Sequence, residues 1–166
     1  MQSDLGQREA ALASTQAAVD IRKQLSKKNP DAFLPVLADS LNNLGAMQSK
    51  LGQHEASLAS TQAAVDIRQP LSEKNPDAFL PGLAMSLNNL GGMQSDLGQH
   101  EAALVSIQAA SNLYWPFFQQ HPQAFARNAD IVLRNEVRYL EALNQQPSVT
   151  LIQRMESIQK HLDDAP

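Results

Sequence analysis

The chain has 166 residues, with thirteen Lys and Arg against seventeen Asp and Glu, a formal net charge of -4 and no cysteine. The lack of cysteine excludes disulfides, thiolate nucleophiles and Cys-ligated metal sites. Without a basic run there is little to neutralise phosphates, so neither a nucleic acid nor a membrane is an expected partner. No stretch reaches the roughly 18 apolar residues of a membrane span, and the first residues lack the order of a signal peptide. We therefore expect a cytoplasmic protein.

The sequence repeats itself with a period of 46 residues. The segment 5–10 returns at 51–56 and 97–102, and the copies 1–46 and 47–92 differ only at positions 4, 8, 11, 23, 24, 27, 36, 39 and 46. A chain that repeats this closely repeats its structure. We predict a single domain with a half repeat, two full repeats and a degenerate capping repeat, over 1–32, 33–78, 79–124 and 125–166.

Each full repeat predicts two helices. Leu37, Leu41, Leu44 and Leu51 follow one another at intervals of 4, 3 and 7 residues, which is the spacing of an apolar helix face. Pro35 shortly before them suits the first turn of a helix. This pattern predicts a helix over 35–51, and Gly52 can adopt the left-handed conformation that ends it. A second helix is predicted over 54–74, because Asn75 precedes a proline and is disfavoured in the α region.

Two features complete the predicted fold. Pro70 removes a hydrogen bond inside the second helix, so we expect a kink or a short break near Gln69. After Pro147 a last helix is predicted over 148–163, which makes seven helices in all. Antiparallel helix pairs in series predict an all-α protein, an α-solenoid.

The pattern Leu41-x2-Leu44-Gly45, followed by Gly52, Leu58 and Ala64, resembles the tetratricopeptide repeat. The 46-residue period is similar to the long-repeat subclass of kinesin light chain and bacterial signalling proteins. This resemblance implies a right-handed superhelix whose first helices line a concave peptide-binding groove. It also implies a scaffold that binds a protein or peptide partner.

Small and polar side chains are expected to face that groove by the same resemblance, and two arginines of the degenerate repeat would suit an acidic or carboxylate group. The candidate groove residues are Asn42, Ser49, Asn88, Ser95, Arg134 and Arg138. Alternatively, the asparagines belong to a solvated face or to inter-helix hydrogen bonds. The alternative for the arginines is surface ion pairing with Glu136 or Glu141.

Two places break the repeat. Met1 aligns with Met47, which lies near the end of the first predicted helix of a repeat, so the chain opens with the second helix of a pair. We expect its apolar face to be covered by a second chain or by another part of a longer array. Alternatively, it is a tolerated terminal helix. Aromatic residues also replace polar ones between 114 and 118, where they either pack beneath the last two helices or form a partner surface. The candidate interface residues are Val19, Tyr114, Trp115 and Phe118.

Catalytic chemistry finds no support in the residue spacing. His54 and His100 lie one full repeat apart, too far to share a metal ion, and there is no Gly-rich phosphate loop or Ser/His/Asp motif. We expect no enzyme activity, no metal and no cofactor. Besides a peptide-binding scaffold, two alternatives stay open: a self-associating module, such as a domain-swapped homodimer, and a sensor fragment of a larger bacterial signalling ATPase or protease.

Overall fold

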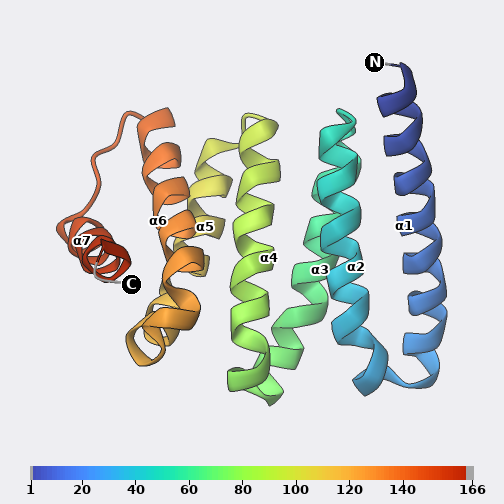
Figure 1. Cartoon of the computed structure of the whole chain (residues 1–166), viewed down its shortest axis with the longest axis horizontal. Helices are drawn as coiled ribbons and strands as arrows, with labels where there is room; N and C mark the ends of the chain where they lie inside the picture. The colour runs from blue at the N-terminus through green and yellow to red at the C-terminus, as the bar shows by residue number, and fades with distance from the viewer. Residues whose placement is uncertain (1, 164–166) are drawn as a thin grey trace. The chain divides into compact units, whose positions relative to one another are not determined.

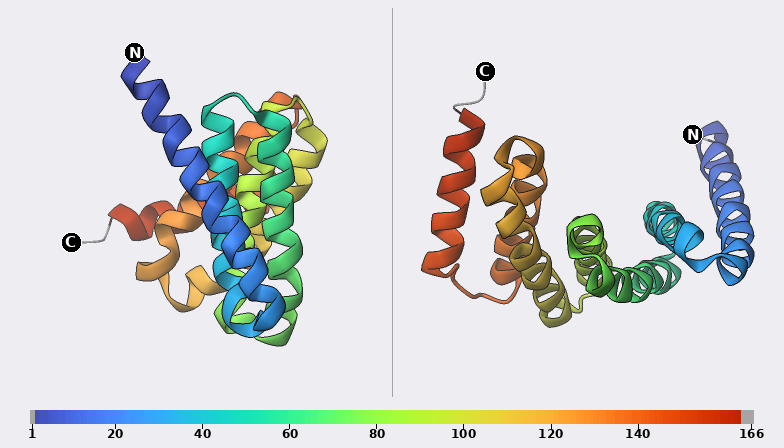
Figure 2. Two further views of the ribbon diagram at one scale, coloured as in Figure 1. Left: turned by 90° about the vertical axis from the view of Figure 1, so that its right-hand side faces the viewer. Right: turned by 90° about the horizontal axis from the view of Figure 1, so that it is seen from below.

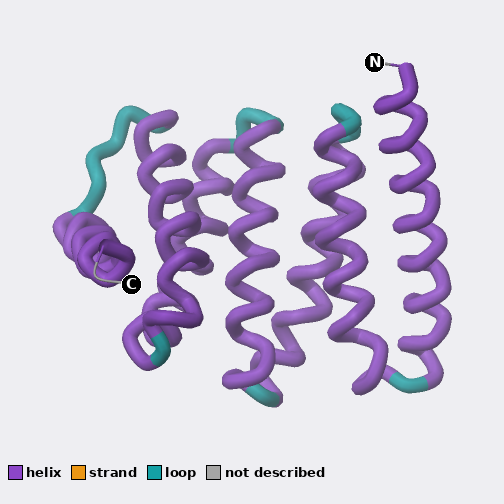
Figure 3. Tube along the Cα trace, in the orientation of Figure 1, coloured by secondary structure: helices purple, strands orange, loops and turns teal. Residues whose placement is uncertain are grey.

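The computed structural model describes residues 2–163, and this part of the chain consists of seven α-helices joined by short connections (Figures 1 and 3). The helices are α1 Gln2–Lys28, α2 Pro30–Lys50, α3 His54–Lys74, α4 Pro76–Asp96, α5 His100–Gln120, α6 Pro122–Ala142 and α7 Val149–Asp163. α1 and α3 both pack against α2, and α5 and α7 both pack against α6. The predicted all-α solenoid and its seven helices are confirmed. None of the described helices is both long and apolar enough to cross a membrane.

The start of the first helix was predicted wrongly. α2 begins at Pro30, five residues before Pro35, because the Asn29 side chain caps it by accepting the Ala32 backbone N–H at 3.4 Å. Proline at the first helical position needs no hydrogen bond there, so Asn29 and Pro30 form a complete start signal. Pro35 is accommodated inside the helix.

The second helix follows the prediction closely. α3 runs over His54–Lys74 and ends at Asn75, while Gly52 has a φ of +73° in the turn before it. Of the kink or short break predicted near Gln69, the break does not occur, because α3 stays helical through Pro70.

The chain forms two compact units, residues 1–79 and 80–166. In the N-terminal unit both α1 and α3 pack against α2 (Figure 2). α2 approaches α3 closely at Gly45, whose carbonyl oxygen accepts a 2.7 Å hydrogen bond from the Ser57 hydroxyl. A Cβ atom at Gly45 would collide with Thr61 Oγ1 and lie 3.1 Å from the Ser57 carbonyl oxygen. The absence of a side chain therefore permits this helix contact.

In the C-terminal unit α6 packs against both α5 and α7. One core cluster centres on Tyr139, which is fully buried with Ile107 and Val132. A second cluster joins Phe118 of α5 to Leu151 and Ile158 of α7. The degenerate end of the sequence thus builds a core with larger side chains than the small ones that line the α2–α3 contact.

Candidate functional site

Polar side chains of α4 and α6 meet on one surface of the C-terminal unit. The Asn135 side-chain amide donates a 2.9 Å hydrogen bond to Asn88 Oδ1, and Asn88 in turn donates to Asn89 Oδ1 at 3.4 Å. All three asparagines are partly exposed. Each amide retains further donor or acceptor capacity, which is what the backbone of an extended peptide requires. We call the surface of Asn88, Asn89, Gly92, Asn135 and Arg138 the α4–α6 face.

Arg138 is the charged residue among the five that define this face. Its guanidinium carbon is 5.1 Å from the centre of the Tyr139 ring, and Nη2 donates a 3.2 Å hydrogen bond to the Tyr139 hydroxyl. Within residues 2–163, no carboxylate forms an ion pair with Arg138, and its side chain is exposed. A Cβ atom at Gly92 would lie 3.9 Å from the Tyr139 hydroxyl, an ordinary van der Waals distance. Arg138 is therefore a positioned cation open to a ligand.

Arg134 is differently placed. It is exposed, but Nε makes hydrogen bonds of 2.9 and 2.8 Å with both carboxylate oxygens of Asp130, one turn earlier on α6. This side-chain hydrogen bond, reinforced by the Asp130 charge, raises the pKa of Arg134. Arg134 thus forms a surface ion pair, the alternative considered for the two arginines, but its partner is Asp130 and not Glu136 or Glu141. Ser95 on α4 is partly buried.

Of the two groove residues predicted in the N-terminal unit, Asn42 is buried and Ser49 is partly exposed. Asn42 is only 8% exposed, whereas the neighbouring Asn43 and Ala46 are exposed. The prediction that Asn42 lines an open groove is therefore wrong, because α2 packs against both α1 and α3 and is buried on more than one face. Ser49 is partly buried.

The predicted interface residues are mostly internal. Val19 is buried with Leu37 and Leu44, and both Tyr114 and Phe118 are buried in the C-terminal unit. These three residues cannot form a surface for a partner in this structure, so their predicted interface role is corrected. Trp115 stays partly exposed, with its ring centre 5.3 Å from that of Phe118. The large rings instead pack beneath α6 and α7.

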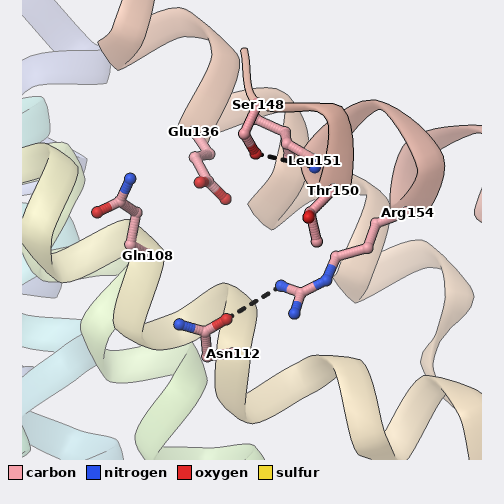
Figure 4. A pocket seen from close by; sticks show the side chains of 7 residues that line it. All are labelled: Gln108, Asn112, Glu136, Ser148, Thr150, Leu151 and Arg154. Carbon is pink, nitrogen blue, oxygen red and sulfur yellow. Dashed lines mark hydrogen bonds between the residues drawn. The ribbon is translucent and has the colours of Figure 1, made fainter.

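A polar cavity of about 210 Å³ lies between α5, α6 and α7 (Figure 4). Glu136, only 8% exposed, faces it from α6, and the Arg154 guanidinium reaches it from α7. Arg154 Nη1 donates to Ser111 Oγ at 3.2 Å and to Asn112 Oδ1 at 3.1 Å, and its guanidinium carbon is 5.2 Å from the Trp115 ring centre. The cavity therefore holds opposite charges that link α7 to the rest of the unit.

The repeat alignment contained a signal for this cavity that sequence reasoning missed. Glu136 stands where the earlier repeats have the buried Leu44 and Leu90, and Ser111 stands where they have Val65. Two apolar positions that meet in the fold thus become polar together. Burial raises the pKa of Glu136, while hydrogen bonds from Ser111 and Gln108 and the charge of Arg154 oppose the increase.

This shift predicts a pH dependence of stability. Because the folded-state pKa of Glu136 lies above its unfolded value, the folded state favours the protonated acid. The free energy of unfolding of the wild type, measured relative to Glu136→Gln, should therefore increase as the pH falls from 7 through the folded pKa toward the ordinary value of 4.5. Urea unfolding of both proteins between pH 7 and 4.5 measures it. A difference that stays constant or moves the opposite way would contradict the burial effect.

Among residues 2–163, no three His, Cys, Asp or Glu side chains are grouped so that they could hold a metal ion. His54 and His100 each have a buried Nδ1 at the start of α3 and α5, respectively.

Comparison with known proteins adds little to this geometry. No protein family matches the sequence, and no curated protein matches it either. Among solved structures the chain is similar to the "Crystal structure of BtubC (BKLC) from P. vanneervenii", at 12% identity, with 96% of this chain and 93% of that chain covered and a TM-score of 0.29. A TM-score this low carries no argument about the function of this chain.

Proposed function

We propose that the chain is a non-enzymatic, tetratricopeptide-like interaction module that binds an acidic segment of a protein partner. The segment would lie in an extended conformation across the α4–α6 face, with a side-chain or C-terminal carboxylate at Arg138. The observation that carries this proposal is the exposed Arg138 guanidinium, held on Tyr139 and paired with no carboxylate among the described residues. Arginine binds carboxylates with two parallel hydrogen bonds, so a positioned arginine favours this ligand class.

The asparagines support an extended ligand next to that carboxylate. The chain of amides from Asn135 through Asn88 to Asn89 offers both donors and acceptors along the face. A peptide backbone presents the complementary groups on every residue. The amides would bind the backbone whatever its sequence, and Arg138 would select acidic segments.

The proposal predicts a specific loss on Arg138→Ala. The probe is a fluorescein-labelled peptide of alternating Glu and Ala residues with a free C-terminal carboxylate, titrated by fluorescence anisotropy. Losing a charge-assisted hydrogen bond should raise Kd about tenfold. Lys160→Ala removes the same charge from an exposed position on α7 and should change Kd by less than about threefold. Equal Kd values for the wild type and Arg138→Ala would refute the assignment.

A further inference from the structure

The N-terminal unit has a partly exposed two-helix face on α1 and α2. On α1, a stripe of side chains spaced three or four residues apart lines this face: Arg8, Ala11, Thr15, Ala18 and Arg22. On α2, a row with the same spacing lies beside it: Ser40, Asn43, Met47 and Lys50. Two hollows of about 400 and 440 Å³ follow these residues. We call this surface the α1–α2 face. Along α1, the side chains in the middle of this face are small, and those at its two ends are arginines.

The same stripe recurs 46 residues later on α3, where a helix covers it. Thr15, Ala18 and Arg22 correspond to Thr61, Ala64 and Arg68. On α3 the threonine is 1% exposed and the alanine 0%, whereas Thr15 and Ala18 are half-buried. The three side chains are thus identical in the two stripes, but a helix buries the threonine and the alanine only on α3.

The helix that covers the α3 stripe is α2, and its contacts define what such a cover needs. Gly45 of α2 lies against Thr61, where a Cβ atom would collide with the Thr61 hydroxyl. Asp39, six residues before this glycine, forms an ion pair with Arg68. The covering helix thus combines a glycine at the contact with an acidic residue almost two turns earlier.

A second covered copy occurs in the C-terminal unit. There Gly91 of α4 lies against α5, where a Cβ atom would be 3.1 Å from the Ala103 carbonyl oxygen and 3.7 Å from the Ile107 nitrogen. Ala103, Ile107 and Ala110 are fully buried. The stripe on α1 is the first of three equivalent stripes, and the other two each receive a helix at a glycine.

We infer that the α1–α2 face docks a helix of a partner protein, with a glycine at the centre of the contact and an acidic residue six positions earlier. The acidic side chain pairs with Arg22, as Asp39 does with Arg68. Charge supports this occupant, because Arg8, Arg22 and Lys50 line the face. A second copy docking through the same face would bring these like charges together, which opposes association.

The test uses a peptide whose sequence already covers such a stripe. A labelled synthetic peptide of residues 30–51 is titrated into the full chain, next to peptides with Gly45→Val and Asp39→Lys. We expect saturable binding of the parent peptide and at least about tenfold weaker binding of each variant, from overpacking and from lost ion pairing. No binding, or equal binding of all three peptides, overturns the inference.

Variants of the chain locate the site. Ala18→Glu places a carboxylate on the face and should weaken binding of the parent peptide at least about tenfold. Ala17→Glu changes the net charge equally at an exposed position beside it and should leave binding within about twofold. Equal binding to both variants places the peptide elsewhere and overturns the inference. Light scattering of the free chain adds a further outcome: a dimer that Ala18→Glu dissociates would identify a second copy as the occupant and overturn the partner-helix assignment.

Discussion

Replacing Tyr139 by alanine should lower the free energy of unfolding by about 4 kcal/mol, the largest effect that we predict. The Tyr139 ring is completely buried in the core cluster of the C-terminal unit, together with Ile107 and Val132. Truncation loses the buried ring and leaves a cavity that helix backbones cannot fill by collapsing. Urea unfolding followed by the fluorescence of Trp115, the only tryptophan, reports directly on this unit.

Tyr139→Phe is the matched control. It keeps the ring and removes only the hydroxyl that accepts the hydrogen bond from Arg138. We expect a loss of about 1 kcal/mol, the contribution of one hydrogen bond. Similar losses for the alanine and phenylalanine variants would show that the ring contributes little to the core and would contradict the packing argument.

Replacing Gly45 by valine should lower the free energy of unfolding by about 3 kcal/mol, through overpacking. The new side chain would collide with Thr61 Oγ1 and press on the Ser57 carbonyl oxygen, which belongs to the backbone of α3 and cannot rotate away. Urea unfolding followed by circular dichroism measures the change. An unchanged midpoint would mean that α2 and α3 are not in close contact at this residue.

Gly6→Ala tests the same argument in the opposite direction. Gly6 lies within α1, and a Cβ atom there meets nothing within 4 Å. Alanine is the better helix former, so this variant should gain up to about 1 kcal/mol. Adding Thr61→Ala to Gly45→Ala should also recover stability that Gly45→Ala loses, since the colliding hydroxyl is removed.

The helices were predictable where local signals agree. Asn75 before Pro76 ended the second helix where α3 ends, and Gly52 adopts the left-handed turn expected of it. The start of α2 was missed, because the leucine spacing after Pro35 drew attention away from Asn29 and Pro30. Capping is a local signal and could have corrected the prediction. A short break at Pro70, one of the two predicted outcomes, does not occur, because a helix held by its neighbours can lose one hydrogen bond and continue.

The sites were less predictable, because they depend on packing between elements. Asn42 and Asn43 are adjacent and chemically identical, so only the helix rotation decides that the first is buried and the second exposed. Arg138 was identified from its repeat position, but its contact with Tyr139 was not. The meeting of Glu136 with Arg154 depends on where α7 lies after the connection that follows α6, and no spacing within the repeat encodes that position.

The proposed binding of acidic segments at the α4–α6 face can be mapped residue by residue. Nitrogen-15 NMR spectra of the full chain, titrated with the alternating Glu and Ala peptide, test it most directly. We expect the largest shift changes at the backbone amides of Asn88, Gly92, Asn135 and Arg138, and we expect Arg138→Ala to remove them. Shift changes centred on other residues, or none at saturating peptide, would contradict it.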